Sequence, residues 1–297
     1  MKISIVDKKD VKISVENRTI KFEDVKLPFK MVDTLIVYKN SVLNSKDIVT
    51  MTSNGINIIF LNNYTNKSSI AHAVNTKNAD LKERQYRSLE KRLFIAKYLL
   101  KNKIQRHVYQ LKCNRIDDID ESSFVKQVEE AETVETLLGI EGNFAREYFK
   151  RFFSLIPSKY HKGKRSKRPP KDPANSLLSY FYFLMYNIIT VRLISFGFEP
   201  SIGYLHTPFR SHNALSSDVM ELFRDQINQF VVFVFKENIV SINDFYKKNG
   251  VYLTFEGKRK LHKPLKDLWN GLESKINSEL SLLRGMLSGE DKNGEFL

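Results

Sequence analysis

Residues 172–197 read DPANSLLSYFYFLMYNIITVRLISFG, and this stretch predicts one long helix at the centre of a globular domain. Asp172 is a typical helix N-cap, Pro173 suits the first helical position, and Gly197 is a typical stop signal. The run between them is apolar on almost every side, as in a helix that is buried all round. It is long enough to span a bilayer, but its tyrosines, asparagine and arginine favour a core helix, so we expect no membrane association.

The chain before this helix changes its pattern once. Apolar and polar residues alternate as in strands over residues 2–6, 12–15, 34–38 and 56–60, with turn residues between these runs. From about residue 78 the apolar residues recur at helical spacing, and a further helix is expected to open at Ser216-Ser217-Asp218. The sequence therefore predicts an α+β protein. A small N-terminal β-sandwich-like domain (residues 1–77) precedes a larger all-α domain (78–288) and a frayed tail (289–297).

The charge of the chain is strongly positive and unevenly distributed. Its 48 Lys and Arg against 34 Asp and Glu give a net charge of +14. Residues 82–112 hold ten basic and two acidic residues, and residues 150–171 hold nine basic and no acidic residues. Both segments are candidate tracks for the phosphates of a nucleic acid. Within them, Arg84, Arg87, Lys164 and Arg165 are candidate DNA-binding residues, although plain solvated charge is an equally good interpretation for such side chains.

Several classes of protein are disfavoured by composition. A single cysteine, Cys113, excludes an internal disulfide framework and a zinc site built from two cysteine pairs. No glycine loop of a nucleotide-binding kind is present, which disfavours a nucleotide-driven enzyme. The N-terminal stretch MKISIVDKKD has no apolar core of signal-peptide length, so we expect a cytoplasmic protein.

Two carboxylates and one imidazole are the candidates for chemistry. Glu141 stands between Gly139 and Gly142, where glycines allow close approach of a ligand or a neighbouring helix; alternatively, Glu141 favours the positive end of a following helix. His206 ends an extended apolar segment and is either a metal ligand or a hydrogen-bonded structural histidine. Glu221 lies one helical turn after Asp218 and is expected to project into a cleft.

Asp218 has two competing interpretations. It is a possible second acid of the site, but Asp-x-x-Glu at a helix start is also a capping box. Two carboxylates and an imidazole without a thiolate suit Mg²⁺ or Mn²⁺ better than structural zinc. Such an ion beside cationic tracks points to phosphodiester chemistry.

Taken together, these segments resemble a known family, the CRISPR-associated endonuclease/integrase that is the catalytic subunit of the spacer-acquisition complex. The resemblance covers nearly the whole chain, in the family's order. Its blocks are residues 35–38, 53–60, 84–86, 137–142, 145–146, 168–180, 197–206, 218–224, 250–254 and 256–259. The most recognisable block is RPPKDPANSLLSY, residues 168–180.

The resemblance implies a site, a reaction and partners. Glu141, His206 and Glu221 match the family's metal-binding and catalytic positions, and Glu221 stands where members carry Asp or Glu. The implied reaction is attack of a DNA 3′-hydroxyl on a phosphodiester of the CRISPR repeat. The implied partners are DNA, a second copy of this chain that pairs through the N-terminal domain, and a small second CRISPR-associated adaptation subunit. Arg210 and Arg224 flank the expected ligands and are candidates for phosphate contacts.

Two other functions stay open on the sequence alone. One is a branched-DNA nuclease used in repair, which would share the chemistry. The other is a non-catalytic basic DNA-binding scaffold whose acids only cap helices, which would show salt-dependent binding and no metal-dependent reaction.

Overall fold

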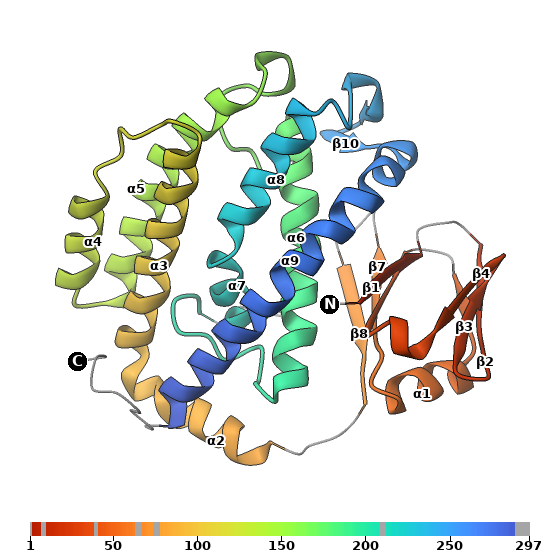
Figure 1. Ribbon diagram of the computed structural model, residues 1–297. Coiled ribbons are helices and arrows are strands. Elements are labelled where there is room, and N and C mark those ends of the chain that lie inside the picture. Colours follow the sequence, from red (N-terminus) through yellow and green to blue (C-terminus); the bar gives the residue numbers. More distant parts are fainter. Residues whose placement is uncertain are drawn as a thin grey trace. The chain divides into compact units, whose positions relative to one another are not determined.

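The computed structural model describes residues 2–6, 10–38, 41–62, 67–73, 78–207 and 212–288 (Figure 1). The chain divides into two compact units: residues 1–78 with 262–284, and residues 79–261 with 285–297. The break at residue 78 lies where the strand pattern ends. Residues 262–284 thus belong to the N-terminal unit, whereas the sequence predicted them as part of the helical domain over 78–288. Helical periodicity indicates that a segment is a helix but not which part of the chain packs against it. The expected tail, 289–297, lies outside the described residues.

The first unit contains two four-stranded sheets. One has the order β1-β5-β7-β8, with β1, β5 and β7 parallel and β8 antiparallel to β7; the other has the order β4-β3-β2-β6. The strands are β1 (Ile3–Val6), β2 (Lys12–Glu16), β3 (Thr19–Phe22), β4 (Val25–Pro28), β5 (Thr34–Tyr38), β6 (Val42–Leu43), β7 (Asn57–Asn62) and β8 (Lys67–Ala71). Leu35 and Ile58 of the first sheet join Ile13 and Ile20 of the second in one apolar cluster. The predicted β-rich N-terminal domain is confirmed.

The parallel pairing of β5 with β7 requires a connection that the alternation pattern did not reveal. Helix α1 (Ser45–Ser53) provides it, and Gly55 follows with φ of +82°, a left-handed conformation that glycine adopts at no steric cost. The predicted turn at residues 16–18 is the hairpin between β2 and β3, with Asn17 and Arg18 both at positive φ.

The second unit is mostly helical, as expected. Helix α3 packs against α4, α5, α7 and α8, and α6 packs against α7 and α8. The helices that lie wholly in this unit are α2 (Ala79–Arg87), α3 (Arg92–Cys113), α4 (Glu121–Glu130), α5 (Val134–Phe152), α6 (Pro173–Phe196), α7 (Ala214–Glu221) and α8 (Arg224–Lys236). Helix α9 (Phe255–Ser288) begins in this unit, and its residues 262–284 belong to the first unit. One short 3₁₀ turn, Phe29–Met31, lies in the first unit, and four others, Ser88–Lys91, Phe153–Leu155, Ser158–Tyr160 and Ile242–Asp244, lie in the second. A hairpin of β9 (Phe245–Lys247) and β10 (Val251–Leu253) departs from the all-α expectation.

The central helix α6 begins and ends as its sequence predicts. The Asp172 carboxylate accepts a hydrogen bond from the Asn175 backbone N–H at 2.8 Å, and Gly197 ends the helix with φ of +93°. This helix alone among the described residues is long and apolar enough to cross a membrane, and 67% of its most apolar window is buried inside the protein. Such burial is typical of a core helix.

Helix α7 begins earlier than predicted. It opens at Ala214 after Asn213, so Asp218 lies in its second half and caps nothing. The prediction that 216–218 opens a helix is therefore wrong, and so is the capping-box interpretation of Asp218. The Asp-x-x-Glu spacing is the same inside a helix and at its start, so the spacing alone does not show whether Asp218 is an N-cap. The point where the preceding chain enters the helix decides between these two positions.

Candidate active site

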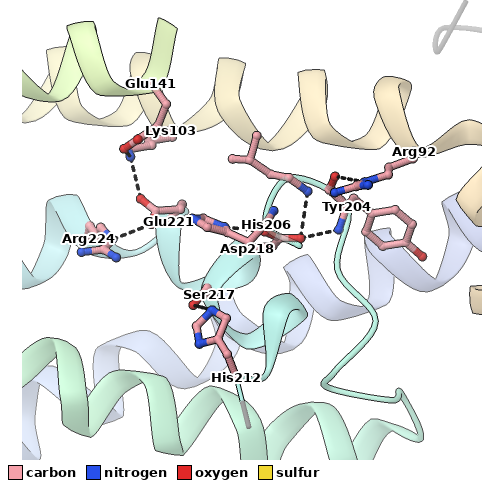
Figure 2. Close-up of polar contacts among 11 residues, drawn as sticks. Arg92, Lys103, Glu141, Tyr204, His206, His212, Ser217, Asp218, Glu221 and Arg224 are labelled. Atoms are coloured by element: carbon pink, nitrogen blue, oxygen red, sulfur yellow. Dashed lines mark hydrogen bonds and ion pairs between the residues drawn. The ribbon is translucent and has the colours of Figure 1, made fainter. Parts of the chain in front are cut away.

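The buried ammonium of Lys103 lies between two of the predicted carboxylates (Figure 2). Lys103 on α3 donates a hydrogen bond to Glu141 Oε1 on α5, and its Nζ lies 2.7 Å from Glu221 Oε2 at the end of α7. The side chains of Lys103 and Glu221 are 4% and 3% exposed, against 24% for Glu141. The structure thus brings Glu141 and Glu221 together through a residue that the sequence analysis did not single out.

Arg224 binds the other oxygen of Glu221. Its Nε donates to Glu221 Oε1 at 2.8 Å, and its guanidinium lies over the Tyr182 ring at 4.4 Å. Burial by itself would raise the pKa of Glu221, but the positive charges of Arg224 and Lys103 outweigh it and hold that pKa well below its ordinary value. Glu221 is therefore a carboxylate at any physiological pH.

His206 is oriented by Asp218. Asp218 Oδ1 contacts His206 Nδ1 at 2.7 Å and accepts the His206 backbone N–H at 2.9 Å, while Oδ2 accepts the backbone N–H groups of Tyr204 and Leu205. The Asp218 side chain is completely buried. Nδ1 is engaged in this way, and among the described residues His206 Nε2 has no partner, which is the arrangement of a metal-ligating histidine with a carboxylate behind it.

The segment that carries His206 is held against α7 and α2. A Cβ at Gly203 would lie 2.7 Å from Ala214 Cβ and 2.8 Å from Asp218 Oδ2, so only glycine allows this approach. On the other side, the buried Gln85 amide donates to the carbonyls of Glu199 and Ile202, each at 2.9 Å. Through these contacts, the sequence blocks 84–86 and 197–206 are held together in the fold.

Two further side chains reach the same segment, Arg92 from the first position of α3 and Ser88 from the 3₁₀ turn before it. Arg92 Nε donates to the Tyr204 carbonyl at 2.7 Å, and the Ser88 hydroxyl lies 2.7 Å from the Tyr204 hydroxyl. Arg106 Nη1 donates to the Leu222 carbonyl at 2.9 Å and so ties the end of α7 to α3. The carboxylates and the imidazole therefore lie on elements that are cross-linked by part-buried polar contacts.

The donor set of this site fits a divalent cation in type. Glu141 and Glu221 supply carboxylate oxygens, His206 supplies Nε2, and Glu221 Oε2 is buried without a hydrogen-bond donor of good geometry. Within the described ranges, however, no three such side chains are close enough to hold an ion as they stand. On the carboxylate side, the Lys103 ammonium lies between the two acids.

The other predicted residues have different surroundings. Glu141 lies in the middle of α5, so the alternative that it favours a helix start is wrong. Neither Gly139 nor Gly142 has another chain segment within 4 Å of where a Cβ would be, so the glycines do not admit a neighbouring helix. None of Glu141, Asp218 and Glu221 caps a helix, which removes the premise of the scaffold alternative.

The candidate DNA-binding residues divide into two groups. Arg165 lies beside the site: its guanidinium is 5.6 Å from the Tyr182 ring that Arg224 also covers, and its Nη1 donates to Asn175 Oδ1 at 2.9 Å. Asn175 also binds the Lys164 carbonyl and thereby fixes the basic segment before α6. Arg84 and Arg87 lie on α2, where the exposed Arg87 pairs with Glu83. Arg210 lies outside the described residues.

Sequence reasoning missed Lys103 and Gln85. Lys103 was counted within the basic segment 82–112, and its one distinguishing signal is its position on the buried face of α3, one turn from the buried residues Leu99, Leu100 and His107. A lysine at an apolar helix position needs a partner of opposite charge. Gln85 carried no such signal, since its burial depends wholly on the segment 199–202.

Comparison with known proteins identifies the family. The family model described as CRISPR associated protein Cas1 matches residues 4–267. The CRISPR-associated endonuclease Cas1 1 of Thermodesulfovibrio yellowstonii is 29% identical, over 97% of this chain and 96% of the relative. A Cas1 endonuclease of Thermus thermophilus is 30% identical, over 75% of this chain and 69% of the relative.

Solved structures agree with the sequence relatives. A Cas1 protein from Thermotoga maritima has a TM-score of 0.91 at 26% identity, covering 99% of both chains. A casposase bound to its integration product has the same fold, with a TM-score of 0.87 at 20% identity, over 100% of this chain and 93% of that one. This chain belongs to the CRISPR-associated Cas1 family, so the resemblance noted from the sequence is confirmed.

Proposed function

We propose that this protein is a divalent-metal-dependent DNA endonuclease/integrase that inserts new spacers into a CRISPR array. The observation that carries the proposal is the meeting of Glu141 and Glu221 at Lys103 in the same helical unit as His206, whose ring is fixed by Asp218. Its relatives are named as Cas1 endonucleases, and a protein of the same fold is a casposase bound to an integration product.

The reaction is a transesterification at phosphorus. A DNA 3′-hydroxyl gives up its proton as its oxygen bonds to a repeat phosphorus; the existing ester bond breaks, and the released 3′-oxygen takes up a proton. One ester bond replaces another, so no nucleotide cofactor is needed. Bound Mg²⁺ or Mn²⁺ would neutralise charge on the phosphoryl group and orient the attacking hydroxyl. Glu141, Glu221 and His206 Nε2 are the residues that would hold the ion.

The remaining residues of the site position and balance charge. Asp218 holds the His206 ring with Nδ1 toward itself, so Nε2 is the ligand atom. Arg224 and Arg165, both on the Tyr182 ring, supply two guanidinium groups that suit phosphate oxygens. Lys164, Arg84 and Arg87 belong to the outer contacts with the DNA backbone in this proposal, and Arg210 remains a candidate for a phosphate contact beside the expected ligands.

The proposal extends to partners and location. DNA is the substrate, and the net charge of +14 favours binding of a polyanion. In a solved complex described as Cas6-RT-Cas1–Cas2, about a third (35%) of one chain has this fold, with a TM-score of 0.79 at 19% identity. By analogy, this protein acts as a homodimer that pairs through the N-terminal domain and assembles with a small second adaptation subunit in the cytoplasm.

Strand transfer tests the proposal directly. Purified protein, with and without the small partner, is given a short duplex with free 3′-hydroxyls and a supercoiled plasmid that carries a CRISPR repeat, in Mg²⁺, Mn²⁺ or chelator. Glu141→Ala should lower joining by roughly 10³-fold or more, because the metal supplies several kcal/mol of transition-state stabilisation. DNA binding should stay within about threefold, since phosphate contacts dominate it.

Glu135→Ala is the matched control, because Glu135 is exposed in the first turn of the same helix. It should join DNA like the wild type. Joining that persists in chelator, or that survives in Glu141→Ala, would overturn the proposal.

A further inference from the structure

The ammonium of Lys103 occupies the place of a cation between the two carboxylates. Both oxygens of Glu221 are already engaged, Oε2 by Lys103 Nζ at 2.7 Å and Oε1 by Arg224 Nε at 2.8 Å. Glu141 Oε1 accepts the hydrogen bond of the same ammonium. A ligand that bridges the two carboxylates therefore competes with these cations, above all for the oxygens of Glu221 (Figure 2).

The charges of this cluster already balance. Glu141 and Glu221 carry two negative charges, and Lys103 and Arg224 carry two positive charges, which is what allows such a group to be buried. A divalent cation added to the intact cluster would leave a net charge of +2 at close range. The repulsion between the divalent cation and the Lys103 ammonium decreases only if that ammonium moves away from the carboxylates.

Lys103 is the cation that can leave. Its charge sits at the end of a flexible four-carbon stem, whereas the planar guanidinium of Arg224 is fixed by Glu221 on one side and by the Tyr182 ring on the other. The contact from Lys103 to Glu221 also lacks good hydrogen-bond geometry, unlike the contact from Arg224.

We propose that Lys103 is the resident counterion of the Glu141–Glu221 pair and that a divalent cation binds these carboxylates by displacing the Lys103 ammonium. This inference rests on the proposed metal dependence of the site. Lys103 then has two effects: it keeps the two acids together when no metal is bound, and it weakens metal binding by competing for the same oxygens.

Mn²⁺ binding to the full-length protein, measured by titration calorimetry without DNA, tests the inference. Lys103→Met removes the charge and keeps the length of an unbranched side chain. It should bind Mn²⁺ at least roughly tenfold more tightly than the wild type, since a positive charge in contact with both ligands is removed. Lys101→Met is the matched control, because Lys101 pairs with Glu129 on the surface two residues away; its Mn²⁺ affinity should equal that of the wild type.

Thermal unfolding provides a second readout. In chelator, Lys103→Met should unfold at a lower temperature than the wild type, because the buried Glu221 and the half-buried Glu141 are left to repel each other. Mn²⁺ should raise the unfolding temperature of Lys103→Met by more than that of the wild type. Lys103→Gln keeps a hydrogen-bond donor without the charge and should show the same tightening of Mn²⁺ binding, so it serves if Lys103→Met does not fold.

The outcomes separate this inference from the function on which it rests. Wild-type binding that is lost in Glu141→Ala, together with unchanged or weaker Mn²⁺ affinity in both Lys103 variants, would overturn the counterion role and leave the metal site standing. Absence of Mn²⁺ binding to the wild type at millimolar concentration, with none in the Lys103 variants, would overturn both. Tighter binding in the variants supports both.

Discussion

The two halves of the candidate site are built in different ways. On one side, His206 is held by a completely buried Asp218 that also accepts three consecutive backbone N–H groups, from Tyr204 to His206. On the other side, Glu141 and Glu221 are held by side-chain cations, Lys103 and Arg224.

The two halves of the site differ in whether their contacts can be exchanged without moving the backbone. Backbone donors cannot leave Asp218 without breaking the path of the chain, so the imidazole is preorganised. A flexible ammonium can leave a carboxylate, so the acidic half can change its partner. We infer that His206 is the fixed ligand of this site and that the two glutamates form its adjustable part.

The largest expected effect on stability comes from removing the Asp218 carboxylate, which holds the His206 half of the site. Asp218→Ala would leave three backbone N–H groups and the His206 ring without their acceptor. Since each unsatisfied buried donor costs about 1–3 kcal/mol, and water or relaxation recovers part of this, the free energy of unfolding should fall by about 3–5 kcal/mol. Urea unfolding measures the change.

Asp218→Asn is the matched variant, because it keeps one acceptor oxygen and the shape of the side chain. It should lose less stability than Asp218→Ala. A loss below about 1 kcal/mol in Asp218→Ala would contradict the view that this half is preorganised by the carboxylate.

A smaller loss of stability is expected from a substitution at Gly203, where the chain passes close to α7. In Gly203→Ala the new Cβ would lie 2.7 Å from Ala214 Cβ and 2.8 Å from Asp218 Oδ2, so the segment before His206 must shift. Overpacking of this kind costs about 1–3 kcal/mol in the free energy of unfolding.

Gly139→Ala is the control for Gly203→Ala. A Cβ there meets nothing within 4 Å, and the position lies inside α5, so alanine should stabilise the helix by about 0.5–1 kcal/mol. Equal changes in the two variants would show that Gly203 is not required for the close approach.

The smallest expected effect is the pH dependence of the free energy of unfolding, which should have opposite signs for His206 and His212. Burial opposes the charged ring of His206, but the hydrogen bond and charge of Asp218 raise its pKa above 6.5. His206 therefore adds stability below pH 6.5 that is lost as pH rises through its raised pKa. Burial and then the charge of His206 lower the pKa of His212, so the contribution of His212 is present above pH 6.5 and is lost as pH falls.

Unfolding in urea with chelator, from about pH 5 to pH 8.5, measures both contributions. His206→Gln should remove a fall of stability on the alkaline side, and His212→Gln should remove a fall on the acid side. The same sign of pH dependence for both variants would contradict the contact between Asp218 and the His206 ring.

Much of the fold follows from local signals. The caps and apolar composition of α6, the alternating strands before residue 62 and the two-residue turn at Asn17 act within a few residues, so they can be read directly. The connection through α1, the start of α7 and the grouping of 262–284 could not, because each depends on which distant surface covers the segment.

The same division holds for the site. The sequence by itself determined which side chains are candidate ligands, Glu141, His206 and Glu221, because donor chemistry belongs to the side chain. Only the tertiary structure decided that Asp218 supports His206 from behind rather than capping a helix, and that Lys103 lies between two acids on other helices. These roles arise when residues far apart in the chain are buried together, since burial makes an unpaired charge costly and so fixes each charged group to its partner.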